Sequence, residues 1–265
     1  MKYAAFFMSV EMERLVVKIG SNVLTRQDGT LDTTAMSAIV DQVVWLRRHG
    51  YEVIMVSSGA VACGRSMLHT DGQLDTVEQR QLFSAIGQVR LMDHYYTLFR
   101  DYGIGVGQVL TMKAHFTPGQ EYDNQRSCME VMLQNGVVPV VNENDTVCVT
   151  ELMFTDNDEL SGLVARMMGA SKLIILSNID GVYTGAPSDP DSVVIRRISA
   201  TDDITKFISP SKSSFGRGGM LSKSAIARQI ASDGIPVIIA NGKKENILIG
   251  LMSDPENTVH TEFCA

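Results

Sequence analysis

The sequence contains few cysteines, and none of them is spaced as a metal ligand. Cys63, Cys128, Cys148 and Cys264 are scattered over 265 residues without a Cys-x-x-Cys pair or a Cys/His ligand spacing. Structural zinc sites need such spacing, and small secreted domains held by disulfides carry a denser set of cysteines. We therefore expect reduced thiols in a cytoplasmic protein and no structural zinc site.

Long apolar runs and dense basic blocks are also absent. No stretch of about 18 apolar residues occurs, which excludes a membrane-spanning helix. The apolar run at residues 3–8 is short and is soon followed by Glu11 and Glu13, so residues 1–12 are interpreted as an N-terminal extension ahead of one domain over 13–265. With 23 Lys and Arg against 30 Asp and Glu, the formal net charge is −7, and we expect no binding to nucleic acid or to a membrane.

Several familiar catalytic signatures are missing. The chain has no GxxxxGK[ST] loop, no GxGxxG after a predicted strand, no HExxH and no GxSxG. Its five histidines share no spacing, so a histidine base is not indicated. Phosphoryl transfer to a carboxylate needs no base, because the acceptor is already ionised near pH 7. That reaction requires positioning, Mg²⁺ and cations near the transferred group.

Short β-branched segments alternate with longer amphipathic segments along the chain. We expect strands at residues 15–19, 53–56, 104–110, 137–141, 173–176 and 237–240, and helices at 33–48, along a long segment ending near 99, and at 122–134, 160–168 and 220–232. Near-continuous apolar strands separated by helices predict one α/β domain with a parallel sheet covered on both faces. Residues 144–156 are expected to form a β-hairpin excursion, and residues 180–206 an insertion rich in turns.

Two of the predicted strands end in segments suited to bind an anion, and ligands of such sheets bind at the carboxyl ends of the strands. Lys18 lies inside an apolar strand, where a lysine is costly unless it is paired or faces a ligand. The alternative is an edge-strand lysine facing water. Residues 57–61 (Ser-Ser-Gly-Ala-Val) combine small residues with the start of a helix, which attracts anions. The alternative here is an ordinary turn with a serine cap.

Two further segments are polar or rich in glycine. The run 142–145 (Asn-Glu-Asn-Asp) and the cluster 156–158 (Asp-Asn-Asp) flank the excursion and could receive the charged groups of an amino acid or orient lysines, although Asp156 could instead be a helix N-cap. Residues 215–223 place three glycines before a helix that has Lys223 in its first turn. This pattern suits a phosphate-binding nest, with a flexible loop as the alternative. A lysine in the first turn opposes the helix dipole, which favours a ligand role.

Taken in order, these segments resemble the amino acid kinase family. The resemblance covers about residues 14–250 and rests on segments 16–21, 57–61, 138–145, 156–158 and 218–223. The Asn-Glu-Asn-Asp run with the later Asp-Asn-Asp is similar to the members that phosphorylate the γ-carboxylate of L-glutamate with ATP, in the first step of proline biosynthesis. The resemblance implies a three-layer αβα sandwich around a mainly parallel sheet of about eight strands.

The same resemblance implies a cofactor, an assembly and a regulator. We expect Mg²⁺ with ATP as co-substrate, and a homo-oligomer that is a dimer or a tetramer. Members are often inhibited by proline at the glutamate site, so proline is a candidate inhibitor. Many bacterial members carry a C-terminal PUA domain of an RNA-binding type, which we do not expect here because only 25 residues follow the sixth predicted strand.

The resemblance also implies roles for individual residues. Lys18 and Lys223 would hold the β- and γ-phosphates and stabilise the transferred group, and Asp158 would orient both lysines. The residues expected to bind glutamate are Ser58, Gly59, Ala60, Asp145 and Asn157, with Asp156 a further candidate. Those expected at the ATP site are Lys18, Ser177, Asn178, Arg217, Gly218, Gly219, Met220, Leu221, Ser222 and Lys223. The family usually has Thr-Asp in place of Ser177-Asn178, and a small polar residue in place of Arg217.

Two other interpretations remain open at the level of sequence. One is a kinase of the same fold acting on another carboxylate or phosphate acceptor. The other is a non-catalytic sensor of an amino acid or nucleotide. The presence of both lysines and Asp158 argues against the sensor, because binding alone does not require stabilisation of transition-state charge. A nicotinamide-dependent oxidoreductase is disfavoured by the missing dinucleotide fingerprint.

Overall fold

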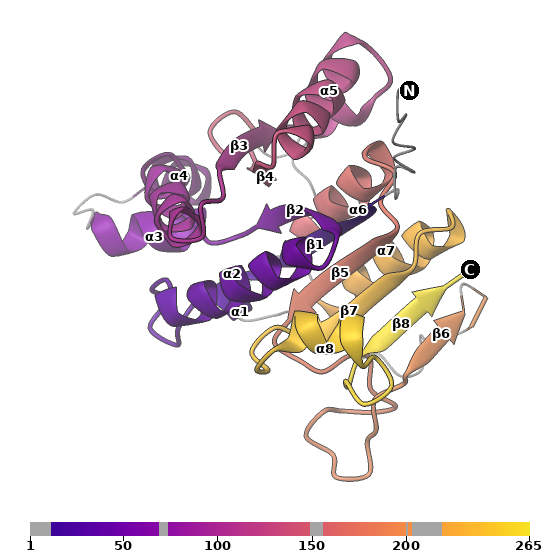
Figure 1. Ribbon diagram of the computed structural model, residues 1–265. Helices are drawn as coiled ribbons and strands as arrows, with labels where there is room; N and C mark the ends of the chain where they lie inside the picture. The colour runs from indigo at the N-terminus through magenta and orange to yellow at the C-terminus, as the bar shows by residue number, and fades with distance from the viewer. Residues whose placement is uncertain (1–11, 69–73, 149–155, 200, 203–218) are drawn as a thin grey trace, which may run out of the picture.

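The computed structural model describes residues 12–68, 74–148, 156–199, 201–202 and 219–265. Within these residues, eight strands form one sheet in the order β3-β4-β2-β1-β5-β7-β8-β6 (Figure 1). The strands are β1 (Glu13–Ile19), β2 (Tyr51–Ser57), β3 (Val106–Thr111), β4 (Val138–Glu143), β5 (Lys172–Ser177), β6 (Arg197–Ser199), β7 (Val237–Asn241) and β8 (Thr261–Cys264).

Helices connect most of these strands. They are α1 (Ser21–Leu24), α2 (Thr33–Arg48), α3 (Ala60–Met67), α4 (Thr76–Arg100), the 3₁₀ helix η1 (Lys113–Phe116), α5 (Gln120–Gln134), α6 (Asn157–Met167), α7 (Met220–Ser232) and α8 (Ile247–Ser253). None of the described helices combines the length and apolar character needed to cross a bilayer.

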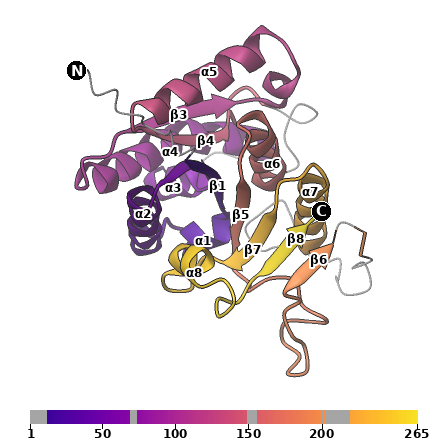
Figure 2. The same cartoon turned by 45° about the vertical axis from the view of Figure 1, so that its right-hand side comes forward.

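The sheet is mainly parallel, as predicted. Strands β3, β4, β2, β1, β5 and β7 pair in parallel, whereas β8 runs antiparallel to β7 and carries β6 alongside it (Figure 2). The parallel strands consequently end at one edge of the sheet, where Ile19 of β1 is in register with Ser57 of β2 and Leu176 of β5. Polar residues that follow these strands are thereby gathered at one place.

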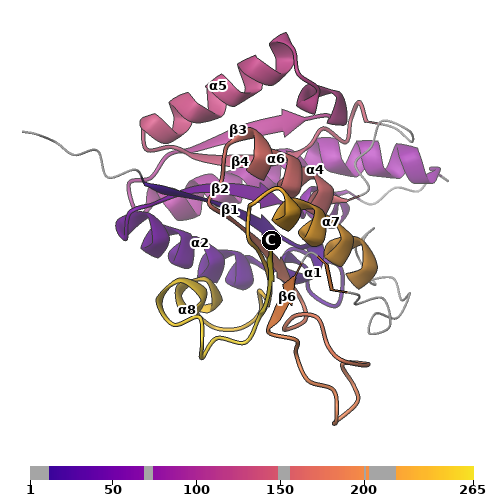
Figure 3. The ribbon, with the colours of Figure 1, turned by 90° about the vertical axis from the view of Figure 1, so that its right-hand side faces the viewer.

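Two apolar cores, one on each face of the sheet, make the expected three layers (Figure 3). Alternation along β1 sends Leu15, Val17 and Ile19 to the core shared with α2, α3, α4 and α8, and Val16 to the core shared with α5, α6 and α7. Among the described α-helices, α5 is the least embedded, with Met129 as its buried residue. The three-layer αβα sandwich predicted from the sequence is confirmed.

The predicted elements agree best with the structure where the periodic pattern of apolar residues extends over several helical turns. Helices α2 and α7 have the predicted bounds, and α6 begins three residues earlier than expected because Asp156 caps it. The short strands β6 and β8 and helix α8 were not predicted. Residues 144–148 form a turn, but residues 149–155 lie outside the described residues, so the hairpin expected over 144–156 stays a prediction. Of the N-terminal extension, only Met12 is described, and it is exposed.

Candidate active site

A buried carboxylate holds two lysines at the carboxyl edge of the sheet. Asp158, in the first turn of α6, has no exposed surface; its Oδ1 lies 2.6 Å from Lys18 Nζ and its Oδ2 lies 2.9 Å from Lys223 Nζ. Lys18 is in the central strand β1 and is 4% exposed, so the alternative of an edge lysine facing water is wrong. Three elements distant in sequence thus bring together the residues expected to handle phosphate.

The charge state of this group follows from its surroundings. Burial alone would raise the pKa of Asp158, but the ammonium groups of Lys18 and Lys223 outweigh burial and lower it. Asp158 is therefore ionised at neutral pH, and with two ammonium groups the cluster carries a net positive charge. The Asp156 carboxylate also acts on both lysines, so the two ammonium groups have two carboxylates near them.

Asp156 begins helix α6. Its carboxylate accepts hydrogen bonds from the backbone N–H groups of Asp158 (2.9 Å) and Glu159 (3.1 Å), which is the N-cap role considered in the sequence analysis. Ser222 Oγ donates to its other oxygen at 3.3 Å and so links the first turns of α6 and α7. Burial, and then the charge of Asp158, raise the pKa of Asp156. The cap fixes the helix start that presents Asp158 to the lysines.

Four of the residues expected to bind an amino acid gather beside this cluster. Asn157 Nδ2 lies 3.0 Å from Ser58 Oγ and 3.2 Å from Asn142 Oδ1. Gly59 has φ 111° and Ala60 is the first residue of α3. Only glycine adopts that φ readily, and it turns the chain from β2 directly into the start of the helix. The turn thus presents a hydroxyl and helix-start N–H groups next to the amide of Asn157.

A buried tyrosine forms a hydrogen bond with the residue before this turn. Ser57 Oγ and Tyr95 Oη share a hydrogen bond of 2.7 Å, and Tyr95 of α4 is fully buried. Burial raises the pKa of Tyr95 well above its ordinary value. The residue is thus a neutral phenol that fixes the position of Ser57, the neighbour of Ser58. Nothing in the local sequence pattern distinguishes Tyr95 from an ordinary core residue.

Asp145, the remaining residue predicted on the amino-acid side, is paired with an arginine that the sequence analysis missed. Arg80 Nε donates to Asp145 Oδ1 at 2.7 Å, and Arg80 Nη2 donates to Glu143 Oε2 at 2.6 Å. Helix α4 thus brings one cation to two carboxylates, Glu143 at the end of strand β4 and Asp145 just after it. The two partners are more than sixty residues from Arg80 in sequence, and no local spacing could have revealed the pairing.

The other residues predicted at the ATP site lie at the end of β5 and at the start of α7. Ser177 is buried at the end of β5, and its carbonyl accepts from the Gly242 N–H at 2.8 Å, whereas Asn178 is exposed. Gly219 precedes α7, whose first residues are Met220, Leu221, Ser222 and Lys223. Arg217 and Gly218 lie outside the described residues.

A polar cluster missed by the sequence analysis follows β5 and β7. Asp180 accepts from Asn241 Nδ2 at 2.9 Å and lies 3.2 Å from Lys244 Nζ. It adds a further charged group to the carboxyl edge of the sheet.

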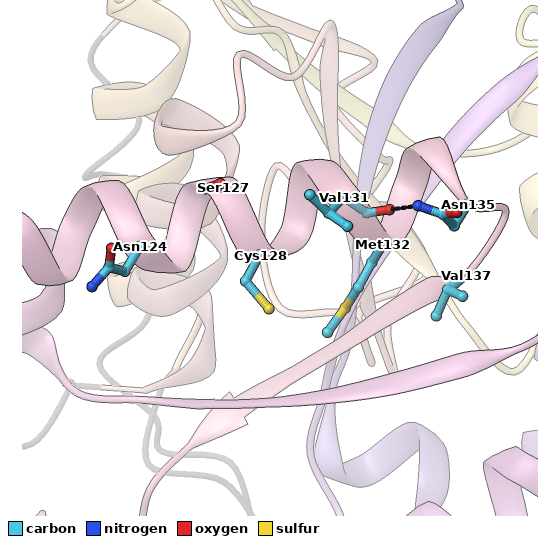
Figure 4. A pocket seen from close by; sticks show the side chains of 7 residues that line it. All are labelled: Asn124, Ser127, Cys128, Val131, Met132, Asn135 and Val137. Atoms are coloured by element: carbon cyan, nitrogen blue, oxygen red, sulfur yellow. Dashed lines mark hydrogen bonds between the residues drawn. The ribbon is translucent and has the colours of Figure 1, made fainter.

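A surface pocket lies elsewhere, along helix α5 (Figure 4). It is lined by Asn124, Ser127, Cys128, Val131, Met132, Asn135 and Val137. Val137 directly precedes β4 and so marks the end of that strand opposite to Asn142. This pocket is separate from the lysine–aspartate cluster, and its lining residues include no carboxylate or lysine.

The chain is similar to known kinases. Residues 13–241 match the model of the amino acid kinase family. The chain is 61% identical over 256 residues to the glutamate 5-kinase of Bacteroides thetaiotaomicron, covering 97% of this chain and 71% of the relative. It is 46% identical over 235 residues to the glutamate 5-kinase of Chlorobaculum tepidum, covering 89% of this chain and 65% of that relative. The chain thus spans about two thirds of the length of these relatives.

Solved structures share the fold at low sequence identity. A substrate complex of an isopentenyl phosphate kinase superimposes with a TM-score of 0.66 at 17% identity, covering 94% of this chain and 99% of the other. A UMP kinase from Bacillus anthracis gives a TM-score of 0.66 at 16% identity, covering 96% of each chain. At this identity the likeness concerns the fold alone. From the family match and the identity to its relatives, the chain belongs to the amino acid kinase family and, within it, to the glutamate 5-kinases.

Proposed function

We propose that the chain transfers the γ-phosphoryl group of ATP to the γ-carboxylate of L-glutamate, giving L-glutamyl 5-phosphate and ADP, in the first step of proline biosynthesis. The observation that carries this proposal is the Lys18–Asp158–Lys223 cluster beside the Ser58–Asn157 group, in a chain 61% identical to a glutamate 5-kinase. Two cations next to polar groups suited to an amino acid are what this reaction needs.

In the proposed mechanism a γ-carboxylate oxygen attacks the γ-phosphorus, the new O–P bond forms, and the bond to the β,γ-bridging oxygen breaks as ADP leaves. No proton moves, because the acceptor is ionised near pH 7. Lys18 and Lys223 stabilise the negative charge spread over the transferred group, and Asp158 keeps both ammonium groups in place. Mg²⁺, when bound with ATP, would supply additional positive charge to the phosphates.

The remaining assignments are part of the same proposal. Ser58, Gly59, Ala60, Asp145 and Asn157 bind glutamate, and Asp156 acts through its cap on α6. The segment from Arg217 to Lys223, with Ser177 and Asn178, lines the ATP site. Residues 13–265 form one kinase domain in a cytoplasmic homo-oligomer, and proline competes with glutamate. The family match over 13–241 and the four free cysteines are consistent with this picture.

The proposal is tested by trapping the acyl phosphate. The chain is incubated with ATP, Mg²⁺ and hydroxylamine, and γ-glutamyl hydroxamate is measured with L-glutamate, aspartate or N-acetylglutamate as acceptor. We expect product from glutamate alone. Product from another acceptor would preserve the reaction type and change the substrate, and absence of product with measurable ATP binding would favour a sensor.

Lys223→Ala tests the chemical step. Loss of its ammonium group should lower kcat by at least about a hundredfold, as expected when transition-state charge loses a stabilising partner. Lys172→Ala serves as the matched control, because Lys172 begins β5 and so lies at the opposite end of that strand from Ser177. Turnover near the wild-type value in Lys223→Ala would contradict the role given to Lys223.

A further inference from the structure

Helix α4 brings a buried amide, Gln88, to the proposed amino-acid site. Gln88 is 7% exposed, and its Oε1 accepts a hydrogen bond from Asn142 Nδ2 at 3.1 Å. The preceding residue, Gly87, packs against the backbone of α3, where a Cβ atom would overlap the Ala60 carbonyl oxygen. This close helix crossing allows Gln88 to approach the elements that carry Asn142 and Ser58.

The orientation of the Asn142 amide is fixed by a backbone group. The Glu143 N–H donates to Asn142 Oδ1 at 2.9 Å, and a backbone N–H can only donate. Asn142 therefore directs its oxygen to this N–H and its Nδ2 toward Gln88. A donor at that position requires an acceptor opposite it, so Gln88 must present its oxygen.

This orientation extends to the residues proposed to contact the substrate. Asn142 Oδ1 also accepts from Asn157 Nδ2 at 3.2 Å, and the same Nδ2 donates to Ser58 Oγ at 3.0 Å. The side-chain oxygen of Asn157 consequently points away from Ser58 and Asn142, where it can act as an acceptor. Ser58, whose oxygen receives a hydrogen bond, has its hydroxyl proton to donate. An acceptor and a donor side by side complement the ammonium and carboxylate groups of an amino acid.

We propose that Gln88 is a positioning residue for the amino-acid site: by accepting from Asn142 it holds the amide orientation that the Glu143 N–H selects, and with it the donor and acceptor pattern that Asn157 and Ser58 offer to the substrate. This inference rests on the proposed function. The role uses only the oxygen of Gln88, since its Nε2 is buried and has no hydrogen-bond partner among the described residues. A glutamate at position 88 would offer an acceptor oxygen in either protonation state, whereas a methionine would offer none.

The test compares Gln88→Met, Gln88→Glu and a matched control, Gln79→Met, which lies on the same helix and whose amide donates to the Leu74 carbonyl. In Gln88→Met we expect the KM for glutamate to rise about tenfold, equivalent to about 1.4 kcal/mol, while the KM for ATP and kcat stay within about twofold. Gln88→Glu should keep the KM for glutamate within about threefold of the wild type. Gln79→Met should match the wild type in all three constants.

Three outcomes would overturn the inference: an unchanged KM for glutamate in Gln88→Met, an equal rise in both KM values, or a folded Gln88→Glu as impaired as Gln88→Met. If Gln88→Met does not fold, Gln88→Leu provides the second apolar variant. A wild-type chain that forms no hydroxamate from glutamate would contradict the proposed function itself. Calorimetric binding of L-glutamate to the same variants would then decide the role of Gln88, and failure of the wild type to bind would refute it.

Discussion

At the scale of single residues, Asp158 is the carboxylate that pairs with two lysines of the site. Lys18 and Lys223 each contact one of its oxygens, and Asp158 itself is fully buried. Without this carboxylate, the two ammonium groups would lose the counter-charge that contacts both of them. Removing one partner of a buried ion pair typically destabilises a protein by about 3–5 kcal/mol. The residue thus serves the stability of the fold as well as the proposed chemistry.

The contribution of Asp158 to stability should depend on pH in a defined window. Because its folded-state pKa lies below the ordinary value of 3.8, its stabilising effect is complete above about pH 4 and is lost as the pH falls through the lowered pKa. We expect Asp158→Asn to be less stable than the wild type by a constant amount between pH 5 and pH 7, and by a smaller amount at pH 3. Urea unfolding at these three pH values measures the difference.

A surface variant provides the control for the pH experiment. Asp93 forms an exposed pair with Arg90 on α4, and exposed pairs contribute little to stability. Asp93→Asn should therefore follow the wild type at each pH. A difference between Asp158→Asn and the wild type that grows toward acid would contradict the lowered pKa of Asp158.

The site residues that could be predicted from the sequence are those recognisable from their immediate neighbours in the chain. A lysine inside an apolar strand required a partner, and Lys18 has one in Asp158. The N-cap role considered for Asp156 could be seen from its place before a helix. Arg80, Gln88 and Tyr95 could not be found in this way, because each lies on α4 and its partner comes from a strand end distant in sequence.

At the scale of helices and strands, the crossing of α3 and α4 is the contact on which the amino-acid side of the site depends. Gly64 of α3 and Gly87 of α4 pack against backbone atoms of the opposite helix, and a Cβ at either position would overlap them. The crossing is therefore closer than side chains would permit. It joins the helix that starts after Ser58 to the helix that carries Arg80, Gln88 and Tyr95.

Gly87→Ala tests this crossing. Helix propensity alone would favour alanine by about 1 kcal/mol, but the overlap with the Ala60 carbonyl must force the two helices apart, and overpacking of this kind typically costs about 1–3 kcal/mol. We expect a lower free energy of unfolding and a raised KM for glutamate. Gly185→Ala, where the nearest atom is a serine hydroxyl at an ordinary contact distance, should change neither. A more stable Gly87→Ala would show that the crossing can relax.

Element length explains which parts of the fold the sequence predicted. Helices α2 and α7 have 16 and 13 residues, enough turns for the helical spacing of their apolar residues to be recognised in the sequence. Strands β6 and β8 have three and four residues, too few to show an alternation. The apolar segment Ile247–Ser253 is equally compatible with a strand or a helix, and its packing as α8 against the α2 side of the sheet is decided by tertiary contacts.

At the scale of the whole molecule, β8 joins two parts of the sheet. It pairs with β7 on one side and β6 on the other, and its Phe263 is fully buried in the core shared with α6 and α7. The side chain of Phe263 thus anchors this end of the sheet in that core. The strand lies away from the proposed site, so its contribution should be to stability.

Phe263→Ala should therefore destabilise the protein without altering its chemistry. Truncation of a buried phenylalanine typically costs about 3–5 kcal/mol through lost transfer energy and the cavity left behind. We expect a loss of this size in urea unfolding, with KM values unchanged at a temperature where the variant is folded. Val259→Ala, at a side chain 40% exposed, should cost far less. Equal losses in the two variants would mean that β8 is not anchored by Phe263.

The position of β8 also constrains the order in which the sheet can be completed during synthesis. In the part of the chain that the structure describes, strand β6 meets the rest of the sheet only through β8, which follows it by about sixty residues. At translation rates of about 5–20 residues per second, β6 must wait several seconds for its neighbour to emerge from the ribosome. Strands β1 to β4 face no such delay, since their partners are already made once β5 appears, whereas β5 itself still awaits β7 on its other side. The part of the sheet that carries Lys18, together with helix α6 and its Asp158, can therefore assemble on the nascent chain well before the far edge of the sheet is closed.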